Sequence, residues 1–348
     1  MQYQVEEALS IRLPDGEKYN KRDSVESFLR GVRLLMGSKL RPLLGGIKSH
    51  IPFLPPANDT QGINLARYSY SVWLRHLVVA YENGLDTYPR RIVEIGQDDP
   101  FGIGLAGLIA GATHYYAFDV SQSHDSDFTT AVFDELTSLF KQRATIPGDD
   151  EFPEVYPHLS SYQFPTHVLT GDLLEKALDK SRLNTLRKQL ASIPDRKNRK
   201  AKVQVLHPDD SDVIEEESID MICSQAALEH IDDLAETYQT QARWLKKGGI
   251  LSHQIDFRSH GVTDDWNGHW TYSNFMWKFI SGHRPHPLNR APLSVHTRLL
   301  QSMGFRVICI LPVRDLGGLN RCQLNRLYKY LPEEIVTTCS AHIISVKE

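Results

Sequence analysis

The sequence predicts an α/β fold built on a doubly wound, mostly parallel sheet of seven strands. Two observations indicate it. Short runs rich in β-branched and aromatic residues alternate with helical stretches, and a Gly or an acidic residue directly follows the first two runs. Strands that alternate with helices pack as a parallel sheet with right-handed crossovers. The candidate strands are residues 92–95, 115–118, 203–206, 219–223, 250–257, 305–311 and 341–346.

Turn and capping residues mark the boundaries of these elements. The first strand ends at Gly96, the second runs into Asp119, and the third follows after a long interval. A helix over residues 233–245 follows the fourth strand. We expect this helix to end at Lys246-Lys-Gly-Gly249, because terminal lysines and glycines suit a helix C-cap. The fifth strand then begins, and two more candidates lie near the C-terminus.

Length and composition fit ordinary globular domains. The 348 residues are 41% hydrophobic and 24% charged, and 39 Lys and Arg stand against 43 Asp and Glu. A net charge of −4 supplies no overall field that attracts nucleic acid or an anionic membrane. The four cysteines form no C-x-x-C pair, which excludes a thiolate zinc site. No apolar run reaches the ~18 residues that span a bilayer, and no signal peptide is recognisable, so we expect a cytoplasmic protein.

The chain divides into a helical N-terminal part and a sheet-containing part. Residues 1–88 show helical patterns but no strand, so we expect them to form a lid or substrate-binding region. Residues 89–348 would form the sheet, with insertions at 121–200 and 257–300 that exceed a simple crossover. Within the first insertion, residues 182–202 hold eight basic residues and one acid. A solvated helical face is the favoured interpretation, and an anionic partner is the alternative.

The end of the first predicted strand suits the close approach of a ligand. Gly96 lets the backbone turn without a Cβ at the carboxyl edge of the sheet, where open α/β sheets bind ligands. Asp98 can cap the helix that follows. Asp119 lies at the tip of the second strand, where an acid can accept hydrogen bonds from both hydroxyls of a ribose. We therefore expect a nucleoside-containing ligand at this edge.

Three successive motifs resemble those of the class I S-adenosylmethionine-dependent methyltransferases. The motifs are Glu94-Ile-Gly96 with Asp119, the run Ser218-Ile-Asp220-Met-Ile-Cys-Ser224-Gln-Ala-Ala-Leu228-Glu229-His230, and Trp244-Leu-Lys-Lys-Gly-Gly249-Ile. The resemblance covers residues 90–260, and the C-terminal strands fit it more loosely. It implies a Rossmann-like sheet and S-adenosylmethionine as the cofactor.

The resemblance also implies which residues bind the cofactor. The methionine part would lie at Gly96, the ribose at Asp119, and the adenine amine at an acid after the third strand. Asp209, Asp210 or Asp212 could be that acid, and Asp210 is favoured. The predicted cofactor-binding residues are Glu94, Gly96, Asp98, Asp119, Val120, Asp210, Ser224, Gln225, His230 and Tyr70. The tyrosine, which precedes the first strand, could close over the pocket, but a place in the core is favoured for it.

Candidate bases for the chemistry follow the fifth predicted strand. Methyl transfer needs alignment of the nucleophile, methyl and sulfur, and removal of a proton when the nucleophile is a hydroxyl. Asp256 and His260 lie at the end of that strand and just past it. His260 could take the proton, while Asp256 holds or polarises the imidazole of His260. His269 is the reserve candidate. Six of the fifteen histidines fall within 253–296, which predicts a polar substrate pocket. A metal site is the alternative, but no metal-binding spacing is present, so no metal is predicted.

The sequence therefore predicts an enzyme that methylates a small molecule. The acceptor atom is expected to be a hydroxyl oxygen of a carbohydrate or of a secondary-metabolite intermediate. One alternative is a non-catalytic partner protein that binds S-adenosylmethionine or S-adenosylhomocysteine. Another is a methyltransferase of protein or RNA, which only the basic stretch 182–202 supports. Neither a nucleic acid nor a membrane is the expected partner, and the sequence leaves the oligomeric state open.

Overall fold

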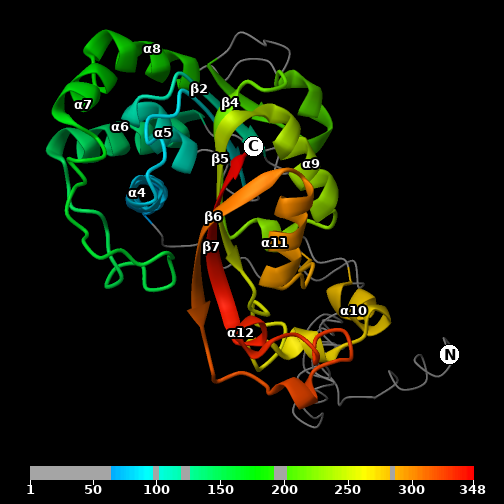
Figure 1. The fold of residues 1–348 in the computed structure, drawn as a ribbon. Helices are drawn as coiled ribbons and strands as arrows, with labels where there is room; N and C mark the ends of the chain where they lie inside the picture. The colour runs from blue at the N-terminus through cyan, green and yellow to red at the C-terminus, as the bar shows by residue number, and fades with distance from the viewer. Residues whose placement is uncertain (1–63, 97–101, 119–125, 192–201, 283–286) are drawn as a thin grey trace, which may run out of the picture.

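A computed structural model describes residues 64–96, 102–118, 126–191, 202–282 and 287–348. Its described part is a central sheet covered by helices on both faces, as Figure 1 shows. The strands are β1 (Arg91–Ile95), β2 (His114–Phe118), β3 (Val203–Leu206), β4 (Ile219–Gln225), β5 (Leu245–Asp256), β6 (Phe305–Arg314) and β7 (Thr338–Lys347). All seven predicted strands are thus present.

The strand order is β3-β2-β1-β4-β5-β7-β6. The first five strands are parallel, and β7 runs antiparallel to both β5 and β6. This confirms the mostly parallel, doubly wound sheet. The order reverses between β1 and β4, and such a switch point opens a crevice at the carboxyl edge of the strands. The ends of β1, β4 and β5 are therefore where a ligand is expected.

Helices form one layer on each face of the sheet. One layer contains α4 (Leu65–Glu82), α5 (Ile103–Ala110), α6 (Ser126–Gln142), α7 (Gly171–Ala177) and α8 (Lys180–Ala191). The other contains α9 (Leu234–Trp244) and α11 (Leu293–Ser302), while α10 (Asn274–Ser281) and α12 (Glu333–Val336) lie toward one end of the sheet (Figure 1). Four short 3₁₀ helices are also described: η1 (Pro208–Val213), η2 (Leu228–His230), η3 (Gly268–Thr271) and η4 (Arg321–Gln323).

Helix α5 packs directly on the sheet because two of its residues lack side chains. A Cβ at Gly104 would lie 2.0 Å from the ring of Tyr115, and one at Gly107 would lie 2.4 Å from Cδ1 of Ile92. Protein interiors leave no room for such an overlap. The glycines therefore bring α5 against β1 and β2, and set the position of its first turn near the carboxyl edge.

The helix predicted over residues 233–245 is present as α9 to within one residue, but residues 246–249 do not cap it. Helix α9 ends at Trp244, and β5 begins at once with Leu245. Residues 246–249 instead form an irregularity of β5, where its register with β4 shifts. Asp220 lies opposite them and holds this irregularity, because its Oδ1 is 2.7 Å from Nζ of Lys246. A contact between strands thus overrides a local capping pattern.

The described part of the predicted N-terminal lid belongs to the main core. Helix α4 is buried along most of its length, with Trp73 and Leu77 packed in the same apolar cluster as residues of β1, β2 and β7. Residues 1–63 lie outside the described residues. A lid formed by that segment stays a prediction. No helix in the described ranges is long and apolar enough to cross a membrane.

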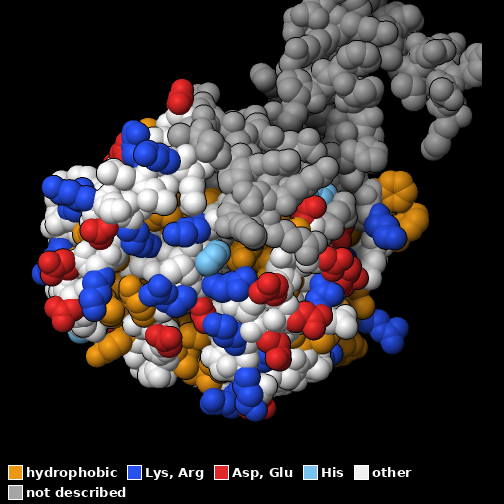
Figure 2. All heavy atoms as spheres, turned by 90° about the horizontal axis from the view of Figure 1, so that it is seen from above, with side chains coloured by type: hydrophobic (Ala, Val, Ile, Leu, Met, Phe, Trp, Pro, Cys, Tyr) orange, Lys and Arg blue, Asp and Glu red, His pale blue; other side chains and the backbone are white. Residues whose placement is uncertain are grey.

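Basic side chains of the first insertion stabilise the fold. Arg182 donates hydrogen bonds to the carbonyl oxygens of Leu108 and Ala112, at 2.6 and 2.7 Å. Arg187 forms a two-pronged ion pair with Asp134. Figure 2 shows Lys and Arg interspersed with Asp and Glu over the face seen from above. The described part of the stretch 182–202 therefore resembles a solvated helical face more than a site for an anionic partner.

Candidate functional site

The carboxyl end of β1 borders open space. Gly96 donates its backbone N–H to the carbonyl of Phe118 on β2, at 3.1 Å. A Cβ built at Gly96 would meet no atom of the described residues within 4 Å, in contrast to the glycines of α5. The space beside Gly96 lies at the switch point between β1 and β4. A cofactor bound there could approach the backbone of this turn closely.

Glu94 holds the first turn of α5 in place. Its side chain is buried, and Oε2 accepts hydrogen bonds from the N–H of Gly104 at 2.8 Å and from the hydroxyl of Tyr115 at 2.6 Å. These contacts join β1, β2 and the start of α5. Glu94 therefore shapes the cofactor edge by positioning the helix, which is a more indirect role than contact with the cofactor.

Three of the predicted cofactor residues lie outside the described residues, and a fourth, Asp210, forms a hydrogen bond within its own turn. Asp98, Asp119 and Val120 lie outside the described residues. Asp210 is half-buried in η1, just after β3, and its Oδ2 accepts a hydrogen bond from the N–H of His207 at 3.0 Å. Asp210 thus lies at the carboxyl edge of the sheet, as predicted, and its side chain stabilises the turn that follows β3. Its contact with adenine stays a prediction.

Ser224 and Tyr70 are core residues in this structure. Oγ of Ser224 is fully buried and lies 2.8 Å from Nδ1 of His253, whose Nε2 lies 3.0 Å from Oε1 of Gln241 on α9. The hydroxyl of Tyr70 donates to the carbonyl of Ala144 at 2.7 Å. Both hydroxyls are therefore committed to packing between the sheet and its helices. The predicted cofactor contacts of these two side chains are not supported, because neither side chain is exposed.

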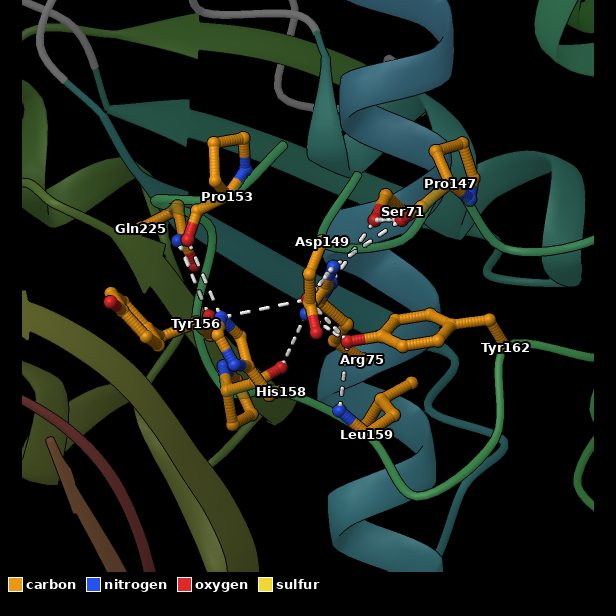
Figure 3. Close-up of polar contacts among 11 residues, drawn as sticks. Ser71, Arg75, Pro147, Asp149, Pro153, Tyr156, His158, Leu159, Tyr162 and Gln225 are labelled. Carbon is orange, nitrogen blue, oxygen red and sulfur yellow. Dashed lines mark hydrogen bonds and ion pairs between the residues drawn. The ribbon is translucent and has the colours of Figure 1, made fainter. Parts of the chain in front are cut away.

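A loop of the first insertion, residues 143–170, returns to the carboxyl edge of β4. The guanidinium of Arg75 on α4, which is 1% exposed, donates to the carbonyl of Pro157 at 2.6 Å and to that of Pro147 at 3.3 Å (Figure 3). At the end of β4, Nε2 of Gln225 donates to the carbonyl of Tyr156 at 3.4 Å. The buried arginine thus fixes the loop that forms one wall of the site.

A second link to this loop comes from the residues after β5. Arg258 forms an ion pair with Glu154, and its guanidinium lies 5.9 Å from the ring centroid of Tyr156. The backbone N–H of Arg258 donates to Oδ1 of Asp256 at 2.8 Å. Both β4 and β5 are therefore connected, at their carboxyl ends, to the same insertion loop.

Four titratable side chains gather beside this wall. Nε2 of His260 lies 3.5 Å from Oδ2 of Asp256 and 4.0 Å from Oε1 of Glu229. The rings of His230 and His260 meet edge to face with centroids 5.0 Å apart. His260 has φ +48°, in the left-handed region that non-glycine residues rarely adopt. The structure therefore brings together three predicted site residues, Asp256, His230 and His260, with one that was not predicted, Glu229.

Glu229 is a buried carboxyl group with no well-formed hydrogen bond to the described part of the chain. It is 3% exposed, and neither Oε1 nor Oε2 has a hydrogen bond of normal geometry. Burial raises its pKa well above the usual range, and the charge of Asp256 adds to this, although nearby backbone N–H groups oppose it. Groups of this kind cluster at functional sites.

The other histidines of the predicted cluster do not converge on this edge. His253, His269 and His296 are buried, and burial lowers the pKa of each to about 3. The ring of His269, the reserve base, packs against the rings of Trp270 and Trp277. His283 and His286 fall outside the described residues. Among the histidines of 253–296 that the structure describes, His260 alone stands at the edge. The spacing of the histidines along the chain could not reveal this, because it does not report burial.

Three contributors to the site were absent from the sequence prediction. Glu229 was part of a quoted motif, but nothing in the motif indicates that its carboxylate is buried. Arg75 and Tyr156 lie far from the motifs in sequence. An arginine within an otherwise apolar helical stretch is the signal that could have identified Arg75. No local signal identifies Tyr156.

Comparison with known proteins supports a methyltransferase domain. Residues 156–252 match the family model described as "Methyltransferase domain". No curated protein matches the chain in sequence. Among solved structures, the chain is similar to a candidate sarcosine dimethylglycine methyltransferase from Galdieria sulphuraria, with 11% identity, coverage of 79% of this chain and 85% of that chain, and a TM-score of 0.40.

Two further solved structures match the chain with similar sequence identities and TM-scores. An S-adenosylmethionine-dependent methyltransferase from Mesorhizobium loti has 14% identity, coverage of 74% and 90%, and a TM-score of 0.35. Phosphoethanolamine N-methyltransferase 2 from Haemonchus contortus, solved with S-adenosyl-L-methionine, has 12% identity, coverage of 83% and 58%, and a TM-score of 0.39. At these TM-scores, we base no argument about this chain on the three structures.

Proposed function

We propose that this protein, a class I S-adenosylmethionine-dependent methyltransferase, transfers the methyl group to a hydroxyl oxygen of a small molecule. The matched methyltransferase domain and the seven-stranded, mostly parallel sheet identify the enzyme class and its cofactor. S-adenosylmethionine supplies a methyl group on a positively charged sulfur, which a nucleophile displaces in line. The open space at Gly96 fits this cofactor, and Glu94 positions the helix start beside it.

The contact between His260 and Asp256 is the observation that carries the choice of a hydroxyl acceptor. A hydroxyl must lose its proton as it attacks, and an imidazole next to a carboxylate can take that proton. Nε2 of His260 lies 3.5 Å from Oδ2 of Asp256, at the same sheet edge as Gly96. In this arrangement, the O–H bond of the acceptor breaks toward His260 while its oxygen bonds the methyl carbon. Asp256 stabilises the imidazolium that forms.

The polar character of the wall supports a hydroxylated acceptor. Gln225, Asp256, Arg258 and His260 stand at the ends of β4 and β5, and Oε1 of Gln225 is buried without a hydrogen-bond partner. Such groups suit an acceptor that offers several hydroxyls, as a carbohydrate or an oxygenated secondary-metabolite intermediate does. A stacking role for Trp270 receives no support, because its ring is fully buried and stacks on Tyr328. We take a small molecule as the partner and the cytoplasm as the location.

Methylation assays with His260→Ala test this proposal. The purified chain is incubated with S-adenosylmethionine and sugar, polyol and phenol acceptors, with matched amine analogues, and formation of S-adenosylhomocysteine is measured. We expect turnover on a hydroxyl acceptor and little or none on the matched amine analogue. His260→Ala should lower turnover by ~10²-fold with little change in cofactor affinity.

Three outcomes would contradict the proposal. Preference for the amine analogues would exclude the hydroxyl acceptor. Full turnover in His260→Ala would exclude the base. Cofactor binding without turnover on any acceptor would favour the non-catalytic alternative. The protein or RNA alternative would require activity on those polymers, and the two described arginines of 182–202 lend it little support because both already bind groups of this chain.

A further inference from the structure

We propose that Glu229, His230 and His260 form a binding site for a divalent transition-metal cation at the carboxyl edge of β4 and β5. Each of the three residues offers one ligand atom, and these atoms all lie within 4.8 Å of one another. The proposal rests on the proposed function only for the place of the acceptor. Cation binding itself can be measured without turnover.

The state of Glu229 is the main argument for a cation. Its side chain is 3% exposed, and among the described residues neither oxygen has a hydrogen bond of normal geometry. An ionised carboxylate in a protein interior is strongly destabilising unless a positive charge compensates it, so without a cation the raised pKa of Glu229 favours its protonated form. The closest described basic group is Nε2 of His260, at 4.0 Å. A metal cation between Glu229 and the two imidazoles would compensate the carboxylate charge and give the group a partner.

The backbone holds these ligands in a prepared arrangement. Glu229 and His230 belong to η2, which Asn289 fastens: its Nδ2 donates to the carbonyls of Leu228 and Ile231, at 2.6 and 2.8 Å. The backbone N–H of Asn289 also donates to the carbonyl of Glu229, at 2.8 Å. His260 follows β5 with φ +48°, and this conformation turns its ring toward η2. A metal site requires ligands that supporting contacts hold in a preorganised arrangement of this kind.

The ligand types indicate which cations would bind. Two imidazole nitrogens with one carboxylate oxygen suit Zn²⁺, Co²⁺, Mn²⁺ and Fe²⁺, whereas Mg²⁺ and Ca²⁺ prefer oxygen ligands. Three protein ligands leave at least one position open for water or substrate. A cation at this place would stabilise negative charge that develops on an acceptor oxygen. With a cation bound, His260 would serve as a ligand in place of the base assigned above, and Asp256, 3.5 Å from it, would be the group that takes the proton.

Cobalt titration of the whole chain tests the site. Co²⁺ gives a visible absorption band that reports its coordination, and the protein is prepared without a histidine tag and with Cys322→Ser, since Cys322 is an exposed thiol. We expect one Co²⁺ per chain, displaced by Zn²⁺ but not by Mg²⁺. Glu229→Gln and His260→Ala should each weaken Co²⁺ binding by ~10-fold or more.

His158→Ala is the matched control. Nε2 of His158 lies 3.5 Å from Oδ1 of Asp149, the same separation as in the His260 and Asp256 pair, but this pair lies on the insertion loop and includes none of the three proposed ligands. Its replacement should leave Co²⁺ affinity unchanged. Glu229→Gln replaces a buried carboxylate with a neutral group of similar shape, so its thermal unfolding temperature without metal should not fall. That measurement separates loss of a ligand from loss of the fold.

Each result of the titration has a defined meaning. The metal site is overturned when Co²⁺ fails to bind, or when Glu229→Gln and His260→Ala bind it as well as the parent protein. Loss of turnover in His260→Ala together with absent Co²⁺ binding would leave His260 as a metal-free base and preserve the proposed function. Ligand-dependent Co²⁺ binding in a protein that methylates no hydroxyl would preserve the metal site and reject the proposed function.

Discussion

Glycines and histidines have different roles in the interior of the sheet and at its carboxyl edge. In the interior, Gly107 lets α5 touch the sheet, and His253 bridges Ser224 to α9. At the edge, Gly96 borders open space, and His260 faces carboxylates and partial solvent. The comparison teaches that burial decides whether a glycine or a histidine serves stability or chemistry. The predictions below test this distinction, beginning with the largest effect.

The interior histidines should make the protein sensitive to acid. Burial lowers the pKa of His76, His253, His269 and His296 to about 3 and that of His342 well below its usual value. The unfolded chain binds these protons near pH 6.5, whereas the folded chain does not. Stability is therefore full above about pH 6.5 and declines as the pH falls toward 3, by ~1.4 kcal/mol per pH unit for each histidine.

Urea unfolding at pH 7.5 and pH 5.5 measures this decline. We expect a free energy of unfolding that is several kcal/mol smaller at the lower pH, since several histidines contribute. Equal values at both pH values would mean that these imidazoles are already charged in the fold or are solvated there.

A pair of glycine variants separates packing from ligand contact. Gly107→Val places atoms against Ile92 and Trp73 and should destabilise the fold by ~3 kcal/mol or more. Gly96→Val enters open space, so it should leave the unfolding temperature nearly unchanged while abolishing binding of S-adenosylmethionine. Thermal unfolding and calorimetric titration measure the two effects. Normal cofactor binding by Gly96→Val would show that the turn at β1 is only structural.

A pair of arginine variants compares a buried arginine, which binds backbone carbonyls, with an exposed arginine in an ion pair. Arg75→Met removes the arginine donor from the carbonyl of Pro157, leaves that of Pro147 with the hydroxyl of Ser71 alone, and should cost ~1–3 kcal/mol of stability. Arg187→Met removes an exposed pair with Asp134 and should cost ~0.2–1 kcal/mol. Limited proteolysis within residues 143–170 should accelerate only in Arg75→Met. Similar proteolysis in both variants would contradict the role of Arg75 in holding the loop.

The smallest effect on stability is expected from His260→Ala. The side chain is partly exposed at the edge, so its removal should change the free energy of unfolding by less than ~0.5 kcal/mol. Its loss of turnover would then be a chemical effect, in contrast to a substitution of His253. A large loss of stability in His260→Ala would place this residue with the interior histidines.

Much of the fold and part of the site could be predicted from sequence. The alternation of strands and helices, the Gly that ends β1 and the run that ends in Glu229 and His230 were sufficient for the sheet and the cofactor class. These signals are local, because strand propensity and turn chemistry depend on neighbouring residues. The end of α9 was predicted to within one residue, but the place of residues 246–249 in β5 was missed, because it depends on contacts with β4, where Asp220 pairs with Lys246.

The sequence by itself determined the element types, the parallel architecture and the motifs that indicate S-adenosylmethionine. Only the tertiary structure decided that His260 stands at the edge while His253 and His269 are buried, and that the carboxylate of Glu229 is enclosed beside it. It also decided that Arg75 brings the insertion loop back to β4. The physical reason is that burial and charge pairing arise from contacts between residues far apart in the chain, which no local pattern records.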